Sequence, residues 1–170
     1  MRIFLVGFSG AGKTYWGKKW GEAHQIKYYD LDEEISVDHG ESVTDIFEKL
    51  GERAFRNLEK EALEYFLEID DFILSCGGGT PCFFDNMDRM NEEGTTIYLH
   101  ATPQQIYNRV ITETDKRPLL KKIEPSEIKA FIDKKLRDRE PSYRKAKIIL
   151  DTEKINDTTF EKILRSLEQV

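Results

Sequence analysis

Short apolar segments alternate with helical patterns along the whole chain. The segments are rich in β-branched or aromatic residues, which is typical of buried strands. The predicted strands are Ile3–Val6, Ile26–Tyr29, Phe72–Ser75, Thr95–Leu99 and Lys147–Leu150. Between them, apolar residues recur at the spacing of one helix face. The predicted helices are Thr14–Ala23, Val43–Leu50, Glu52–Ile69, Asp85–Glu93, Pro103–Thr112, Ser126–Arg139 and Thr158–Leu167.

Two of these helices begin with a capping pattern. Ser42 is followed three residues later by Asp45, and Thr102 by Gln105. Alternation of strands with helices predicts an α/β fold, in which helices flank both faces of a parallel sheet. Ligands of such sheets bind at the carboxyl ends of the strands, so functional residues are expected there. No repeat or linker divides the chain, and we expect one domain over residues 1–170.

Composition narrows the class of protein. The chain of 170 residues is 39% hydrophobic and 34% charged, as in soluble globular proteins. Its apolar runs are too short to span a membrane, and no export leader opens it, so we expect a cytoplasmic protein. We also expect a monomer. The net charge of −6 argues against a nucleic-acid surface. Cys76 and Cys82 have no second pair and no nearby His, which predicts neither a disulfide framework nor a zinc site.

A glycine-rich motif after the first predicted strand indicates nucleotide binding. Residues 7–14 read G-F-S-G-A-G-K-T, which matches the P-loop pattern between a strand and a helix. Backbone N–H groups of such a loop surround the β-phosphate of ATP, the lysine contacts the phosphates, and the hydroxyl binds Mg²⁺. The alternative is a glycine-rich turn without a ligand. The residues expected to contact the nucleotide are Gly10, Ala11, Gly12, Lys13, Thr14 and Tyr15.

Two carboxylates follow the second predicted strand. Asp30 and Asp32 are two residues apart, so in a strand they share one face. One could act on the metal's water shell while the other accepts a proton from a hydroxyl substrate. The alternative is a solvated acidic turn that continues into Glu33 and Glu34.

Further along the chain, arginines and glycines suggest an anion-binding surface. Arg56 and Glu59 are three residues apart on a predicted helix, so the carboxylate can hold the guanidinium; a surface ion pair is the alternative. Gly77, Gly78 and Gly79 follow the third strand and expose backbone N–H groups.

The second half of the chain adds two more arginines. Arg117 begins R-P-L-L within the polar stretch 113–124, where we expect a lid. Arg139 precedes Pro141, which is expected to end the long helix.

Together these motifs resemble the shikimate kinase family. The family pattern is a P-loop, D-x-D, G-E-x-x-F-R-x-x-E, G-G-G, R-P-L-L and R-x-P-x-Y, and all six occur here in that order over residues 7–143. The resemblance implies a P-loop NTPase fold of the nucleoside-monophosphate-kinase type, with a five-stranded parallel sheet, an acceptor-binding region at about 31–60 and a lid. It also implies transfer of the γ-phosphoryl group of ATP to the 3-hydroxyl of shikimate, in aromatic amino-acid biosynthesis.

The resemblance further implies a role for individual residues. Asp32 would bind the shikimate hydroxyls and act as the base, and Asp30 would lie near Mg²⁺. The carboxylate of shikimate would be bound by Arg56 and Arg139, and its ring by the backbone of Gly77, Gly78 and Gly79. Arg117 would reach the ATP phosphates, and Arg109 would flank the adenine. After the last strand, family members often carry a basic residue and Asn-Pro, whereas residues 153–157 here read E-K-I-N-D.

Two other classes of protein share part of the pattern. A related small-metabolite kinase, such as a gluconate kinase, has the P-loop and the sheet but does not require both acceptor arginines and the G-G-G turn. A non-catalytic ATP-binding module should have lost Lys13, Asp32 or an acceptor arginine, and all of these are present.

Overall fold

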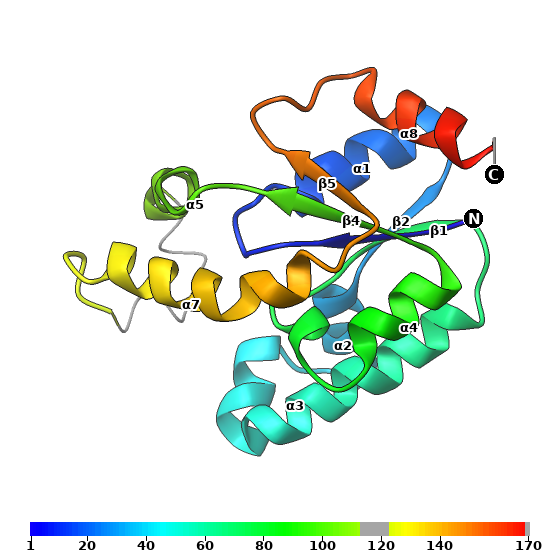
Figure 1. Cartoon of the computed structure of the whole chain (residues 1–170). Coiled ribbons are helices and arrows are strands. Elements are labelled where there is room, and N and C mark those ends of the chain that lie inside the picture. Colours follow the sequence, from blue (N-terminus) through cyan, green and yellow to red (C-terminus); the bar gives the residue numbers. More distant parts are fainter. Residues whose placement is uncertain (113–122, 169–170) are drawn as a thin grey trace.

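The centre of the molecule is a parallel sheet of five strands in the order β2-β3-β1-β4-β5 (Figure 1). The computed structural model describes residues 1–112 and 123–168. Every pair of neighbouring strands is parallel. The strands are β1 (Arg2–Val6), β2 (Lys27–Asp30), β3 (Phe72–Ser75), β4 (Thr95–His100) and β5 (Ile148–Asp151). The five predicted strands are thus confirmed, each to within one residue at either end.

Helices cover both faces of this sheet, as predicted. Figure 1 shows α1 and α8 over one face and α3, α4 and α7 over the other. The helices of the described residues are α1 (Lys13–His24), α2 (Leu31–His39), α3 (Val43–Leu67), the 3₁₀ turn η1 (Thr80–Cys82), α4 (Asn86–Glu93), α5 (Pro103–Val110), α7 (Ile128–Tyr143) and α8 (Thr159–Leu167). None of them is both long enough and apolar enough to cross a membrane.

The central strands form the core because both of their faces are covered. Residues Ile3 to Val6 of β1 have no exposed surface, which explains why this strand is a continuous apolar run. On the outer side of α1, Trp20 stacks on Phe160 of α8 with ring centroids 4.8 Å apart.

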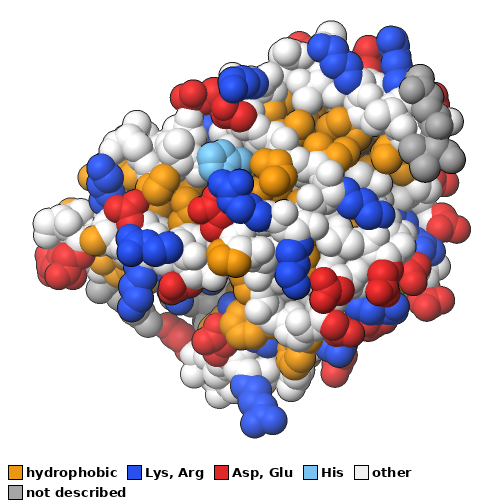
Figure 2. All heavy atoms as spheres, viewed as in Figure 1, with side chains coloured by type: hydrophobic (Ala, Val, Ile, Leu, Met, Phe, Trp, Pro, Cys, Tyr) orange, Lys and Arg blue, Asp and Glu red, His pale blue; other side chains and the backbone are white. Residues whose placement is uncertain are grey.

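Positive and negative side chains are interspersed on the face shown in Figure 2.

Both predicted capping patterns are present. The Ser42 hydroxyl accepts a hydrogen bond from the backbone N–H of Asp45, and Thr102 forms a reciprocal capping box with Gln105. The two helices predicted on either side of Gly51 form α3, which is kinked at this glycine. Gly51 has φ 80°, a conformation that residues with a Cβ rarely adopt.

Two predictions near the site were wrong. Asp32 was expected at the end of a strand, but β2 ends at Asp30 and α2 begins at the next residue. The Asp30 carboxylate accepts hydrogen bonds from the N–H groups of Asp32 and Glu33, and so caps this helix. Pro141 was expected to end α7, but the helix continues to Tyr143.

Pro141 is tolerated because it lies in the last turn of α7. There, its missing N–H removes one hydrogen bond, while Arg144 N–H still donates to the carbonyl of Glu140 at 2.9 Å. The continued helix places Arg139 and Tyr143 four residues apart on one face.

Candidate active site

A cavity of about 810 Å³ lies at the carboxyl ends of the strands. The phosphate loop and the turn after β3 both line this cavity. Most predicted site residues line it: Gly10, Gly12, Lys13, Thr14, Tyr15, Asp30, Asp32, Gly77, Gly78 and Arg109. The fold therefore brings together residues from four separate segments of the chain. Arg117 lies outside the described residues.

The phosphate loop presents the amino end of α1 to the cavity. Gly12 is the N-cap residue, has φ 100°, and supplies no side-chain cap. The first N–H groups of α1 are therefore available to an anion, which the helix dipole also favours. Lys13 is buried, and its ammonium group donates to the carbonyls of Gly7 at 2.8 Å and Phe8 at 3.1 Å. The lysine thus lies against the loop whose anion it is expected to contact.

Arg109 of α5 supports the same loop from outside. Its Nη1 donates to the carbonyls of Gly10 at 3.2 Å and Ala11 at 3.0 Å. Tyr15 lies at the rim of the cavity and is 62% exposed. Arg109 and Tyr15 thus both line the cavity beside the phosphate loop.

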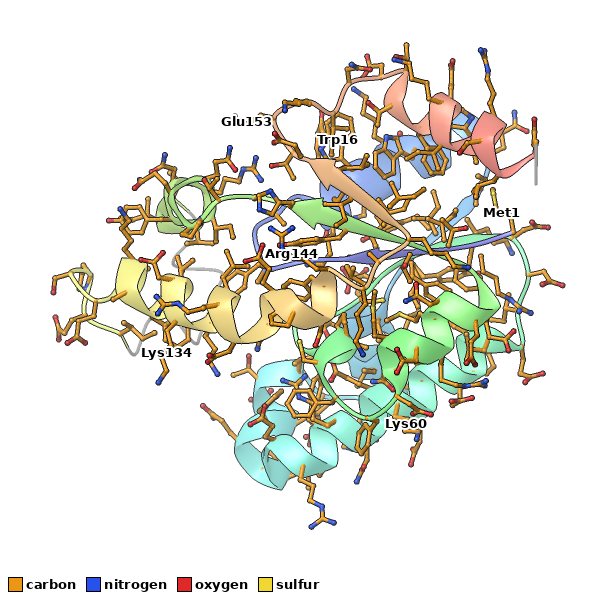
Figure 3. All side chains as sticks on the ribbon, viewed as in Figure 1. Met1, Trp16, Lys60, Lys134, Arg144 and Glu153 are labelled. Atoms are coloured by element: carbon orange, nitrogen blue, oxygen red, sulfur yellow. The ribbon has the colours of Figure 1, made fainter. Side chains whose placement is uncertain are left out.

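The segment after β5 borders α1. Lys19 of α1 forms an ion pair with Asp157, and Figure 3 shows Glu153 and Trp16 at this edge of the molecule. Lys154 is 83% exposed at its side chain and pairs with Asp151. Asn156 accepts hydrogen bonds from Thr158. Where family members carry Asn-Pro, this chain therefore has a loop held by its own side chains and by α1.

Asp30 and Thr14 form an oxygen-rich pair beside the phosphate loop. The Thr14 hydroxyl donates to Asp30 Oδ2 at 3.4 Å, and so does the hydroxyl of Tyr28, also at 3.4 Å. A hydroxyl and a carboxylate are ligands that Mg²⁺ accepts, and this ion usually takes its other ligands from phosphate and water. Within the described residues no cluster of three or more His, Cys, Asp or Glu side chains could hold a metal. The hydroxyl of Thr14 and the carboxylate of Asp30 fit Mg²⁺ bound together with a nucleotide.

Asp32 lies at the meeting point of the phosphate loop and the glycine turn. Burial, first of all, and the nearby charges of Asp30 and Glu59 together raise the pKa of its carboxyl group to about 6, against the opposing effects of Lys13 and Arg56. A Cβ at Gly77 would lie 2.9 Å from Asp32 Oδ1. A carboxylate with this pKa is ionised at neutral pH and can accept a proton from a hydroxyl.

Arg56 is buried rather than part of a surface ion pair. Its side chain is 7% exposed and that of Glu59 is 1% exposed, with Nη1 and Oε2 at 2.5 Å. Nη2 also pairs with Glu52 at 3.1 Å. The second oxygen of Glu59 accepts a hydrogen bond from the hydroxyl of Thr80 at 2.6 Å. A buried charge of this kind is stable only with such partners.

The glycine turn after β3 is shaped by close approach of side chains from two other helices. A Cβ at Gly79 would lie 2.5 Å from Nη1 and Nη2 of Arg56, and a Cβ at Gly78 would lie 3.0 Å from Arg139 Nη1. The hydroxyl of Tyr143 donates to the carbonyl of Gly78 at 2.5 Å. Only residues without a side chain leave room for two arginines here, so Arg56 and Arg139 flank one turn at the edge of the cavity.

Three contributors to the site were missed or only partly recognised from the sequence. The burial of Glu59, the hydroxyl of Thr80 and the hydroxyl of Tyr143 hold Arg56 and the glycine turn in place. Thr80 directly follows the G-G-G motif, and Tyr143 is the last residue of the R-x-P-x-Y motif, whose contact with Gly78 was not predicted. Their partners are distant in sequence, so spacing alone carried no signal for them.

A phosphate loop and a carboxylate of raised pKa line one cavity, and two arginines flank the glycine turn that borders it. This arrangement defines a P-loop phosphotransferase for a small anionic acceptor. Comparison with known proteins agrees. The shikimate kinase family profile matches residues 9–168. The chain is 42% identical to a shikimate kinase of Parabacteroides distasonis over 154 residues, which cover 91% of this chain and 89% of the relative.

Solved structures give the same result. The chain matches a shikimate kinase from Bacteroides thetaiotaomicron with a TM-score of 0.89 and 34% identity, over 99% of this chain and 97% of the other. It matches a shikimate kinase from Acinetobacter baumannii, solved in complex with shikimate, with a TM-score of 0.82 and 28% identity, over 99% and 90%. This chain belongs to the shikimate kinase family of ATP-dependent phosphotransferases. The predicted family and fold are thereby confirmed.

Proposed function

We propose that the protein transfers the γ-phosphoryl group of Mg²⁺-bound ATP to the 3-hydroxyl of shikimate. The observation that carries this proposal is the glycine turn after β3. There Asp32, Arg139 and Arg56 approach Gly77, Gly78 and Gly79 in turn, and the first two of these glycines line the cavity together with the phosphate loop. Shikimate offers the matching chemistry, because it has a carboxylate for the arginines and hydroxyls for the aspartate.

The phosphate end of the cavity would stabilise the charge of the transferred group. The N–H groups at the start of α1 and the ammonium of Lys13 provide fixed positive charge in a partly enclosed site. Thr14 and Asp30 would hold Mg²⁺ with the phosphates, and the ion would neutralise charge that develops in the transition state.

The acceptor end would position the hydroxyl and remove its proton. Arg56 and Arg139 would bind the carboxylate of shikimate through planar guanidinium groups, which fix direction as well as charge. Asp32 would then accept the proton of the hydroxyl as its oxygen bonds to phosphorus and the bond to the leaving ADP breaks. Local positive groups are needed because the chain as a whole carries a net charge of −6.

The remaining assignments belong to the same proposal. We propose a cytoplasmic monomer with one domain, in which residues at about 31–60 bind the acceptor and residues at about 113–124 form the lid. Arg117 would contact the ATP phosphates, and Arg109 would flank the adenine in addition to its contacts with the loop.

The substrate test uses mass spectrometry of candidate acceptors. With Mg·ATP, shikimate should gain one phosphate, whereas gluconate and nucleoside monophosphates should not. A gluconokinase from Sinorhizobium meliloti matches this chain with a TM-score of 0.57 but only 17% identity, so the two share the fold alone. Turnover of gluconate without phosphorylation of shikimate would overturn the proposal.

A further inference from the structure

The guanidinium group of Arg56 lies close to aromatic rings as well as to carboxylates. Its Cζ lies 4.3 Å from the ring centroid of Phe83 and 5.5 Å from each of the Phe47 and Phe55 rings. Phe83 is thus the nearest of three aromatic rings around this cation. Phe47 and Phe55 belong to α3, the same helix as Arg56, whereas Phe83 follows η1, after the glycine turn.

The two ion pairs of Arg56 both come from its own helix. Glu52 and Glu59 both lie on α3, and each accepts from a different terminal nitrogen. Nε is buried and has no hydrogen-bond partner among the described residues. The direction in which the Nε–H of Arg56 points depends on the plane of the guanidinium group.

Two contacts from outside α3 restrict that plane. The guanidinium lies against the backbone of Gly79, since a Cβ there would be 2.6 Å from Arg56 Cζ. Phe83 presents its ring to the same group. A cation close to an aromatic ring is attracted to it, and a planar guanidinium also gains from stacking.

The segment that carries Phe83 is anchored on both sides. The hydroxyl of Thr80 donates to Glu59, and Asn86 Nδ2 donates to the Thr80 carbonyl at 3.0 Å. The N–H of Cys82 donates to the carbonyl of Gly79 at 2.8 Å. The ring of Phe83 is therefore held at a set position relative to the glycine turn.

We propose that Phe83 is a positioning residue for the acceptor: its ring holds the guanidinium of Arg56 in the plane that binds the shikimate carboxylate. This inference rests on the proposed role of Arg56. Phe83 acts only through that side chain, so its removal should affect the acceptor and leave the nucleotide end of the cavity unchanged.

The test compares Phe83→Leu with its neighbour, Phe84→Leu. Phe84 is 56% exposed, and its ring meets only the ammonium of Lys60 at 5.2 Å among the described cations, so it is a matched control. Lys60 is labelled in Figure 3. We expect Phe83→Leu to raise the KM for shikimate about threefold to tenfold without changing the KM for ATP. Phe83→Tyr, which keeps an aromatic ring, should keep the wild-type KM for shikimate. Phe84→Leu should leave the KM for shikimate and the KM for ATP unchanged.

A double-variant cycle separates this proposal from the one it rests on. In an Arg56→Lys background, Phe83→Leu should have no further effect on the KM for shikimate, because the planar group is already gone. If Arg56→Lys impairs the acceptor KM but Phe83→Leu does not, the role of Phe83 is wrong and that of Arg56 stands. If Arg56→Lys has no effect, the proposed acceptor site itself is wrong. Two other results would also overturn the inference, because they would show that Phe83 acts through general stability. One is an equal change in the KM for shikimate and the KM for ATP; the other is an effect of Phe83→Leu that persists in the Arg56→Lys background.

Discussion

Replacement of Asp32 by Asn tests the base and its electrostatic environment in one experiment. The substitution keeps the shape of the side chain but removes its charge and its capacity to accept a proton. General-base removal costs about 10²–10⁴-fold in rate, so we expect kcat to fall by that factor while ATP binding persists. The exposed Asp38 lies on the same helix, and Asp38→Asn is the matched control.

The raised pKa of Asp32 predicts how the wild-type enzyme depends on pH. Since its pKa is raised to about 6, the carboxylate is mostly ionised at pH 7 and mostly protonated at pH 5. We expect kcat/KM for shikimate, measured at saturating Mg·ATP, to fall about tenfold per pH unit below about pH 6. A constant kcat/KM between pH 7 and pH 5 would contradict the assignment.

The same shift predicts an opposite effect on stability. The folded-state pKa lies above the usual value of 3.8, so between about pH 4 and pH 6 the folded state binds more protons than the unfolded state. Stability is therefore lost as the pH rises through this window, and the loss is complete above about pH 6. A pKa raised from 3.8 to about 6 corresponds to at most about 3 kcal/mol in the free energy of unfolding.

Asp32→Asn should remove this penalty. We expect its free energy of unfolding at pH 8, from urea denaturation, to exceed that of the wild type by about 1–3 kcal/mol, whereas the two should converge near pH 4. An inactive variant that is less stable than the wild type at pH 8 would refute the electrostatic reasoning. A variant that keeps kcat within a few-fold of the wild type would show that Asp32 is not the base.

Two further predictions concern the arginines. Arg56→Lys and Arg139→Lys should each lower kcat/KM for shikimate about 10- to 100-fold with little change in ATP affinity, because lysine keeps the charge but not the planar fork. Steady-state kinetics of the double variant should show less than additive losses, since both residues serve one carboxylate; unchanged constants in both single variants would contradict the acceptor site. Arg117→Ala should impair turnover while shikimate binding persists, and backbone hydrogen exchange over residues 113–124 should slow when ATP and shikimate are both bound. Equal exchange with and without these ligands would argue against a lid.

Local sequence determined the framework of this protein. The five strands could be predicted because a parallel strand covered on both faces must be apolar along its whole length, and β1 shows this from Ile3 to Val6. The phosphate loop could be predicted for a related reason. Its function depends on backbone conformation within one short segment, such as the positive φ of Gly12, and glycine at that position is visible in the sequence.

Where two local signals competed, the sequence was ambiguous. Asp30 could end a strand and also cap a helix, and the acidic residues that follow suit a first helical turn as well as a solvated turn. Pro141 disfavours a helix interior, but its cost is small in the last turn, where few hydrogen bonds remain to be lost. In the folded chain α2 buries Leu31 and Ile35, and the last turn of α7 buries Tyr143, which favours the helix in both places.

Burial and contact at the acceptor site were decided only by the tertiary structure. The spacing of Arg56 and Glu59 allows an ion pair, but the sequence does not distinguish a solvated pair from a buried one. The glycine turn packs against α3, removes water from both groups, and adds the hydroxyl of Thr80 and the ring of Phe83. Such contacts join residues more than twenty positions apart, so they depend on how β3 and α3 come together rather than on any local pattern. The sequence determined which charged groups the site contains, and the fold determined their environment, and with it the raised pKa of Asp32 and the orientation of Arg56.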